Sequence, residues 1–229
     1  MKTFKIISVF CLLTGFLVSQ EMAGFELMHS ARYIGDLKTQ SRTGVAGYRY
    51  YSPYGTRVGL FIGVNQYKFL NDNKKSIFME SPSALILKAK LHQTLSALYV
   101  HGATQYYRID GEISSRIEGN SNIIYHNYYE MFEFPIGLGF TLNNKDITAS
   151  VGVLKTYFYG TNEIEILVDT EGNKASLGTD NQGSFTDELP IAGEINVVYN
   201  FSKLLNIELN YTQFSKKDFA IQVSFWSPF

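Results

Sequence analysis

The stretch FAIQVSFWSPF, residues 219–229, closes the sequence and shows a pattern that recurs along the chain. Its side chains alternate between two faces of an extended segment. One face carries Phe219, Ile221, Val223, Phe225 and Phe229. The other face carries Ala220, Gln222, Ser224 and Trp226. Strict alternation of this kind is typical of a β-strand with one apolar face.

Working back from this stretch, nine earlier segments show the same alternation, which makes ten predicted strands. They are 24–33, 45–51, 57–69, 84–92, 96–107, 123–142, 146–160, 189–201, 204–214 and 219–229. A helix is the alternative over 84–98, because Leu, Ala and Lys are good helix formers. The unbroken alternation from Leu85 to Leu91 favours a strand.

The predicted connections alternate in length. Short turns are expected near 52–55, 93–94, 143–145 and 202–203, and longer polar loops near 35–43, 70–82, 109–122 and 161–188, with 215–217 as a short exception. This rhythm predicts an all-β, antiparallel, up-and-down barrel with ten strands, or eight if one hairpin merges or is lost. Short turns on one side and long loops on the other are typical of transmembrane barrels.

The N-terminus, residues 1–20, has the composition of a secretory signal peptide. Lys2 and Lys5 precede an apolar run over 6–18, which is too short for a spanning helix. Cys11 is either a lipoprotein site or an ordinary residue of this run, and the apolar residues that follow it favour the second. Residues 21–229 are then one domain without cysteine, which excludes disulfides and thiolate chemistry there.

Composition narrows the class of protein further. Charged residues make up 18% of the 229 residues, aromatic residues 15%, and the net charge is -1. This balance gives no electrostatic case for a nucleic-acid partner. No later run is long and apolar enough for a membrane helix, so a membrane-spanning chain must be a barrel.

Alternation alone leaves open which face of the barrel looks outward. A soluble, lipocalin-like barrel would hide the apolar face inside. The polar face carries charges of both signs, which suit pairing inside a lumen: Glu26, Arg32, Arg49, Arg57, Lys88, Lys90, Glu133, Glu194 and Glu208. It also carries small residues, Gly59, Gly63, Gly137, Gly139 and Gly152. Tyr and Phe gather near the strand ends, as in membrane girdles, so we expect the apolar face to contact lipid.

The segment FEFPIGL, residues 132–138, resembles the aliphatic–Glu–aliphatic–Pro–aliphatic signature of the bacterial outer-membrane β-barrel domain family, the small OmpA-like barrels. The final strand ending on Phe229 is similar to the assembly signal of that class. Met131 stands where the family usually has an aromatic residue, two places before the Glu. The resemblance implies a porin-like protein of the cell outer membrane, with outer-membrane lipid and the barrel-assembly machinery as partners. It carries no catalytic residues and no cofactor to this chain.

Two sets of residues are candidates for chemistry. The histidines are His29, His92, His101 and His126, and none lies in a nucleophile motif. The acidic residues Asp169, Glu171, Asp180, Asp187 and Glu188 match no calcium-loop spacing. We therefore expect interfacial or luminal histidines and a solvated loop, and predict no catalytic, cofactor-binding or metal residues.

The luminal charges have two interpretations, an ion-pair plug or the lining of a narrow channel. A barrel of about ten strands is close to the size that side chains fill. We expect a plug centred on Glu133, beside Pro135, Gly137 and Gly139. The predicted function is a structural or surface-interaction role through the outer loops, whose ligand the sequence does not identify. The alternatives are an enzyme acting on lipid or peptide at the outer rim, and a narrow channel.

Overall fold

The structure is a computed structural model that describes residues 20–34, 37–52, 54–70, 79–80, 84–116, 121–144, 146–170, 172–202 and 204–228. Residues 1–19 of the predicted signal peptide and Phe229 lie outside the described residues, and Gln20 already belongs to the first strand. Among the described residues, no helix is long and apolar enough to cross a membrane.

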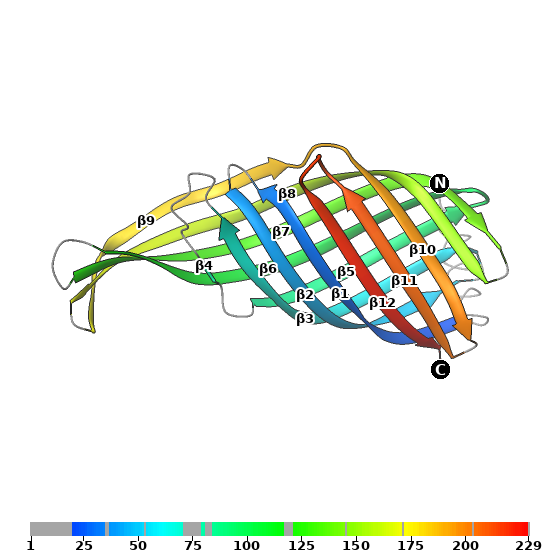
Figure 1. Cartoon of the computed structure of the whole chain (residues 1–229), viewed down its shortest axis with the longest axis horizontal. Helices are drawn as coiled ribbons and strands as arrows, with labels where there is room; N and C mark the ends of the chain where they lie inside the picture. Colours follow the sequence, from blue (N-terminus) through cyan, green and yellow to red (C-terminus); the bar gives the residue numbers. More distant parts are fainter. Residues whose placement is uncertain are drawn as a thin grey trace, which may run out of the picture.

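Ten strands close into an antiparallel ring (Figure 1), as the sequence predicts. The ring runs β10-β11-β12-β1-β2-β3-β5-β6-β7-β8, and β8 pairs with β10 to close it. Its members are β1 (Gln20–Ile34), β2 (Leu37–Tyr51), β3 (Thr56–Leu70), β5 (Ala84–Leu95), β6 (Leu98–Arg116), β7 (Ser121–Asn143), β8 (Ile147–Thr170), β10 (Ala192–Ser202), β11 (Leu205–Gln213) and β12 (Phe219–Pro228). Two further strands pair outside the ring: β4 (Met79–Glu80) with β3, and β9 (Asn173–Glu188) with β8.

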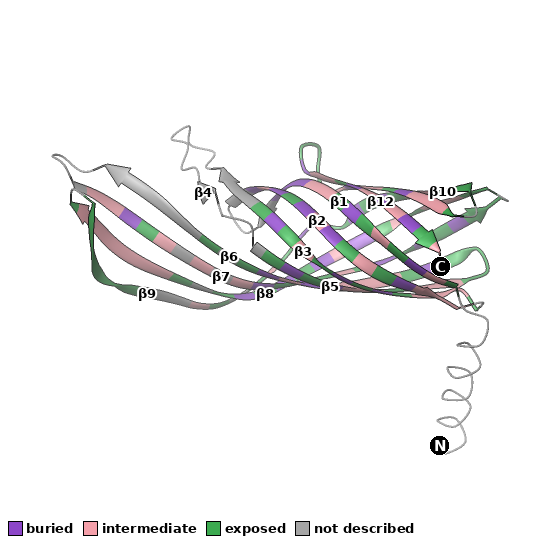
Figure 2. Cartoon of the chain, turned by 90° about the horizontal axis from the view of Figure 1, so that it is seen from below, coloured by how far each residue is buried: buried purple, intermediate pink, exposed green. Residues whose placement is uncertain are grey.

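The apolar face of the strands points outward and the polar face points into the lumen. Leu60, Leu138 and Phe140 are 61%, 58% and 62% exposed, whereas Glu26 and Glu133 are 1% and 3% exposed. Figure 2 shows buried and exposed positions alternating along β1, β2 and β3. Because the apolar face is exposed, the lipocalin-like arrangement, which would hide that face inside, is wrong. The apolar core inside the barrel comes instead from residues of the other face, such as Phe61 and Trp226.

The segment 84–98, for which a helix was the alternative, forms β5 and the start of β6. Its turn falls at Ser96 and Ala97 rather than at 93–94, and Ser96 has a φ of 59°. Its outward Leu85, Leu87 and Leu91 are 45–55% exposed. An outward row of leucines requires the period of two that only a strand provides.

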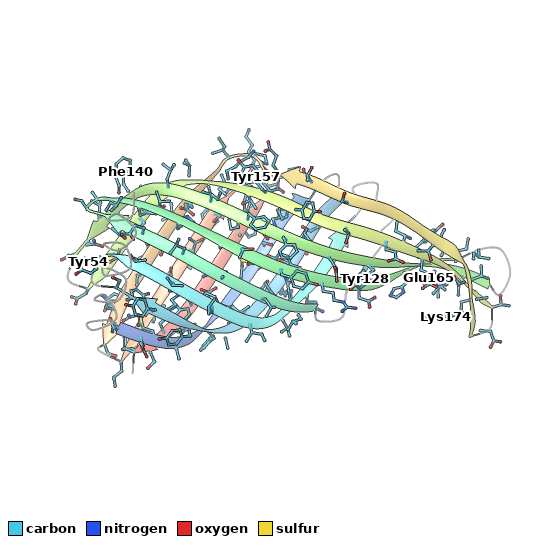
Figure 3. All side chains as sticks on the ribbon, turned by 180° about the vertical axis from the view of Figure 1, so that it is seen from behind. Tyr54, Tyr128, Phe140, Tyr157, Glu165 and Lys174 are labelled. Atoms are coloured by element: carbon cyan, nitrogen blue, oxygen red, sulfur yellow. The ribbon has the colours of Figure 1, made fainter. Side chains whose placement is uncertain are left out.

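The four strands β6 to β9 continue beyond the ring as a projecting sheet, here called the tongue (Figure 1). It comprises the cross-strand row Arg108–Glu130–Thr161–Ser184 and the residues beyond it. The strand β7 contributes 121–130 to it, a length of roughly 30 Å. Figure 3 places Tyr128 and Glu165 along the tongue, Lys174 near its tip, and Tyr54 at the opposite end of the barrel.

The tongue corrects the prediction of long loops at 109–122 and 161–188. The described residues of both segments are mostly strand, and in the second a turn at Gly172 leads into β9. Cross-strand backbone hydrogen bonds, rather than burial, organise these polar hairpins, so the sequence lacks a clear apolar pattern there. The loop expected at 35–43 is also shorter, because β2 begins at Leu37, and most of the one at 70–82 lies outside the described residues.

Candidate functional site

The lumen is crossed by a cluster of charges centred on Glu26, here called the hub. The Glu26 carboxylate, 1% exposed, accepts hydrogen bonds from Arg49 at 2.8 Å, Lys88 at 2.8 Å and Lys90 at 2.9 Å. Arg49 also donates to Glu208 at 2.5 Å. The hub therefore joins four strands, β1, β2, β5 and β11, across the interior.

The predicted centre of the network, Glu133, instead belongs to a second cluster. Arg32 donates to both of its carboxylate oxygens at 2.7 Å, and the Tyr107 hydroxyl donates to it at 2.6 Å. The Arg32 guanidinium also lies 5.3 Å from the Phe158 ring centroid. The correction is that Glu133 holds one basic side chain, whereas Glu26 holds three. The curvature of the closed barrel brings β5 opposite β1. Alternation within a strand gives the face of each residue but does not show which strands face each other across the lumen.

A third luminal cluster surrounds Glu194, where a tyrosine and a histidine take the place of the Lys or Arg partners expected from the sequence. The Tyr99 hydroxyl donates to Glu194 at 2.6 Å, and the His101 Nε2 lies 2.7 Å from the same carboxylate oxygen. Small neighbours make room for these rings: a Cβ at Gly137 would lie 2.2 Å from the His101 Nε2, and one at Gly152 would lie 2.3 Å from the Tyr99 hydroxyl. This cluster explains why glycines line that part of the polar face.

Arg57, also predicted to join the network, is placed differently. Its guanidinium lies 5.1 Å from the Tyr51 ring, and no carboxylate among the described residues pairs with it. Tyr51, one of the tyrosines near a strand end that together suggested a membrane girdle, packs against the luminal core. Both residues therefore belong to the lumen rather than to the ion-pair network or the lipid contact.

Aromatic and apolar side chains fill the lumen near the short-turn end. Trp226, Met22 and Phe61 are 1%, 1% and 5% exposed. The rings of Phe61 and Trp226 meet edge to face, with centroids 5.7 Å apart, and the Arg49 guanidinium lies 3.8 Å from the Trp226 centroid. This layer lies beside the hub, so both apolar packing and charge pairing close the interior.

The tongue has two chemically different faces. The face that continues the luminal side carries the partly exposed apolar residues Ile123, Tyr125, Ile164, Ile166 and Val168. The face that continues the outer surface is mostly polar and charged, with Asp110, His126, Glu130, Glu163 and Glu165, but it also carries the buried Ile124 opposite Leu167. Near the base of the tongue, the Glu130 carboxylate accepts hydrogen bonds from Tyr106 at 3.2 Å and Tyr128 at 2.9 Å.

The candidate histidines are not brought together in one place. His92 and His101 lie in the lumen, with ring centroids 6.2 Å apart, while His29 packs on Phe219 with centroids 6.0 Å apart. His126 on the tongue pairs through Nε2 with Asp110, and its Nδ1 lies 3.7 Å from Glu165. A catalytic base needs one ring nitrogen turned to a nucleophile or water. Both nitrogens of His126 face carboxylates, an arrangement that ties neighbouring strands together rather than one that presents a catalytic base.

The acidic candidates hold turns and ion pairs. Asp169 accepts a hydrogen bond from the Gly172 amide at 2.8 Å, Asp187 accepts one from the Glu188 amide at 2.8 Å, and Glu188 pairs with Lys155 at 2.9 Å. Glu171 lies outside the described residues, as does the Asp180 side chain. Within the described part of the chain, no group of three His, Cys, Asp or Glu residues has the geometry to hold a metal ion.

No protein-family model matches the chain, and no curated protein matches it. Among solved structures, the translocator domain of the autotransporter NalP from Neisseria meningitidis is similar, with a TM-score of 0.54 and 12% identity over 92% of this chain and 88% of that chain. The beta domain of the Bordetella autotransporter Brka has a TM-score of 0.48 and 10% identity over 92% of this chain and 99% of that chain. For the attachment invasion locus protein Ail of Yersinia pestis, the TM-score is 0.31 and the identity 9%, over 92% of this chain and 95% of that chain.

The similarity to the NalP domain shows the fold alone, a closed barrel of the outer-membrane type. It gives this chain no activity and no ligand. The assignment to the small OmpA-like group, which rests on residues 132–138, stays a prediction.

Proposed function

We propose that this chain is a bacterial outer-membrane barrel with a closed lumen, and that its tongue is an extracellular interaction element. The proposal includes export through the predicted signal peptide and insertion by the barrel-assembly machinery. The belt of exposed apolar side chains supports a lipid environment: Leu60, Ile62, Leu138 and Val151 are each more than half exposed. So does the barrel fold itself, which in the outer membrane leaves no strand edge unpaired in lipid.

The interior supports a closed barrel. Barrels of about eight strands have interiors that side chains fill, and aqueous channels need about sixteen. Here the hub, the Arg32–Glu133 pair and the aromatic layer around Trp226 occupy the lumen. Ion pairs at 2.5–2.8 Å between buried side chains resist the passage of ions, which favours the plug over the channel.

The observation that carries the interaction role is the apolar face of the tongue. Ile164, Ile166 and Val168 follow one another on this face and stay partly exposed, although the tongue projects beyond the barrel. Apolar patches rimmed by polar residues mark interaction sites on soluble surfaces. We therefore assign to this face the binding of an apolar surface on an extracellular partner.

The test compares cells that display the wild-type protein with cells that display the double variant Ile164→Ser, Ile166→Ser. Adhesion to matrix-coated surfaces and to neighbouring cells is measured at equal surface expression. We expect the double variant to lose adhesion, because its apolar face becomes polar, and the control Glu163→Gln on the opposite face to retain it. Equal adhesion of cells that display the wild type and the double variant would refute the proposed interaction role of the tongue.

Protease added to intact cells tests the orientation in the same strains. We expect cleavage near Gly172, at the tip of the tongue, and protection of the turn around Tyr54 at the other end of the barrel. Gly172 has a φ of +90° and its backbone amide bonds Asp169, in a turn that is accessible beyond the barrel. Cleavage around Tyr54 in intact cells would invert the proposed topology.

A further inference from the structure

The lumen contains a cavity of about 160 Å³ beside the hub. At about 30 Å³ for each water molecule, this is room for roughly five waters, or for one small ligand and its bridging waters. The charged residues of its wall are Arg32, Arg49, Arg57, Lys88, Lys90, Glu133, Glu194 and Glu208. Five basic residues thus face three acidic ones, and the lumen cluster keeps a basic excess when Glu26 is counted as well.

The carboxylates of this wall are already engaged. Glu133 is held by Arg32 and Tyr107, Glu194 by Tyr99 and His101, and Glu208 by Arg49 and Asn196. Charge in a narrow interior is costly unless it is compensated. The excess positive charge of the wall therefore has no remaining carboxylate among these residues to neutralise it.

Three adjacent strands place donors on one cross-strand row of the wall. Arg57 on β3 pairs in register with His92 on β5, and His92 pairs with His101 on β6. Residues opposite each other on neighbouring strands lie about 5 Å apart, so the three side chains form one continuous set. Lys90 lies two residues before His92 on the same face, and its side chain, 28% exposed, is the most accessible of the hub cations. Arg57 stands near the start of β3, at the short-turn end, where it is partly exposed.

The same wall holds buried polar atoms that have no hydrogen-bond partner within the described part of the chain, among them the Gln105 Oε1, the Thr156 Oγ1 and the Asn196 Oδ1. Gln105 and Thr156 are 6% and 1% exposed. Buried polar groups in folded proteins are almost always hydrogen-bonded, to protein or to bound molecules. The cavity is therefore built to hold hydrogen-bonding guests rather than an apolar one.

We propose that the luminal cavity binds a small oxyanion of the phosphate or carboxylate class, through Arg57 and Lys90, with the His92 ring beside them. A guanidinium presents two parallel donors that match the oxygens of such an anion. Bridging waters satisfy Gln105 and Thr156. Because the cavity lies inside the barrel, the site is independent of the interaction proposed for the tongue.

The experiment uses the full barrel, refolded in detergent micelles in a buffer free of phosphate. Phosphorus NMR of inorganic phosphate and the thermal midpoint of unfolding are followed as sodium phosphate, sodium acetate or sodium chloride is added at equal ionic strength. The variant is Arg57→Gln. The matched control is Arg108→Gln, because Arg108 also lies over a tyrosine ring, at 4.8 Å from Tyr128, but outside the lumen.

We expect phosphate or acetate to raise the midpoint more than chloride does, in the wild type and in Arg108→Gln alike. The apparent affinity of Arg57→Gln should fall at least about tenfold. If Arg57→Gln fails to fold, two other measurements test whether phosphate binds in the cavity. They are the phosphate affinity of His92→Gln and the phosphorus line width with the wild-type protein. Equal effects of the three salts on the midpoint would overturn the proposal, and would mean that the excess charge is relieved in another way, such as loss of the Lys90 proton. Unchanged phosphate binding in Arg57→Gln would also overturn it.

Discussion

Replacing Glu26 by Gln is the change that most directly perturbs the interior. The substitution keeps the shape of the side chain but removes the negative charge that Arg49, Lys88 and Lys90 share at 2.8–2.9 Å. Arg49 retains Glu208 at 2.5 Å, whereas Lys88 and Lys90 lose the carboxylate they bond. Removing one partner of a buried ion pair costs about 3–5 kcal/mol, so we expect a loss of at least this size.

Glu133→Gln provides the comparison. This substitution leaves one basic residue, Arg32, without its carboxylate partner. The Arg32 guanidinium keeps its contacts with the rings of Phe158 and Phe214 at 5.3 and 6.0 Å. We therefore expect Glu133→Gln to destabilise the barrel less than Glu26→Gln. Glu163→Gln, on the exposed face of the tongue, should change the free energy of unfolding by no more than about 0.5 kcal/mol.

The assay is equilibrium unfolding in urea of protein refolded into lipid vesicles, followed by tryptophan fluorescence. With an m-value of about 2 kcal/mol per M, the expected loss for Glu26→Gln lowers the midpoint by roughly 1.5–2.5 M. A shift smaller for Glu26→Gln than for Glu133→Gln would show that Glu26 is not the centre of the luminal network.

Three further predictions concern the walls and the end of the chain. Leu138→Arg should lower the free energy of unfolding by about 2–4 kcal/mol in a folding titration, because the side chain is 58% exposed on the lipid side. Ser184→Arg on the tongue should lower it little, and equal losses would mean that the faces are reversed. Gly137→Ala should cost about 1–3 kcal/mol, since its Cβ would lie 2.2 Å from a luminal imidazole, and Gly193→Ala, which meets nothing within 4 Å, should be nearly neutral in the same titration. Deleting Phe229 should lower the yield of assembled barrel in outer-membrane fractions, and normal assembly would show that the final strand is not the assembly signal.

Much of the barrel can be predicted from the sequence, because lipid on one side and a filled lumen on the other impose a period of two on every strand. The last strand shows this directly: Ile221 is 39% exposed, and Trp226, on the other face, is 1% exposed. The same alternation is enough to assign Glu26, Arg49 and Glu208 to the lumen.

The partners inside the lumen cannot be predicted in this way. Alternation gives the face of each residue, but contacts across the interior depend on strand tilt and on the curvature of the closed ring. Lys88 reaches Glu26 from a strand that is not its hydrogen-bonded neighbour. Glu133, which local small residues favoured as the centre, lies instead beside Arg32.

The strands of the tongue could not be predicted from the sequence for a different reason. Outside the membrane, neither face of a strand must be apolar, so residues 173–188 read as a polar, glycine-containing loop. Its strand β9 follows β8 with two irregularities in register, at Asn162/Glu163 and Ile166/Leu167. A weaker signal lies on β8, where Ile164 and Ile166 alternate with Glu163 and Glu165 until Leu167 interrupts the pattern.

Planar-bilayer recording of the wild-type barrel is the most direct test of a lumen closed by the hub and the aromatic layer. Purified, refolded protein is inserted into a bilayer in concentrated KCl, and insertion is verified independently by protease protection. We expect no steady ionic current, because Glu26 and its three basic partners span the interior and Trp226 lies beside them. A steady current through the wild type, with Glu26→Gln altering ion selectivity rather than stability, would contradict it.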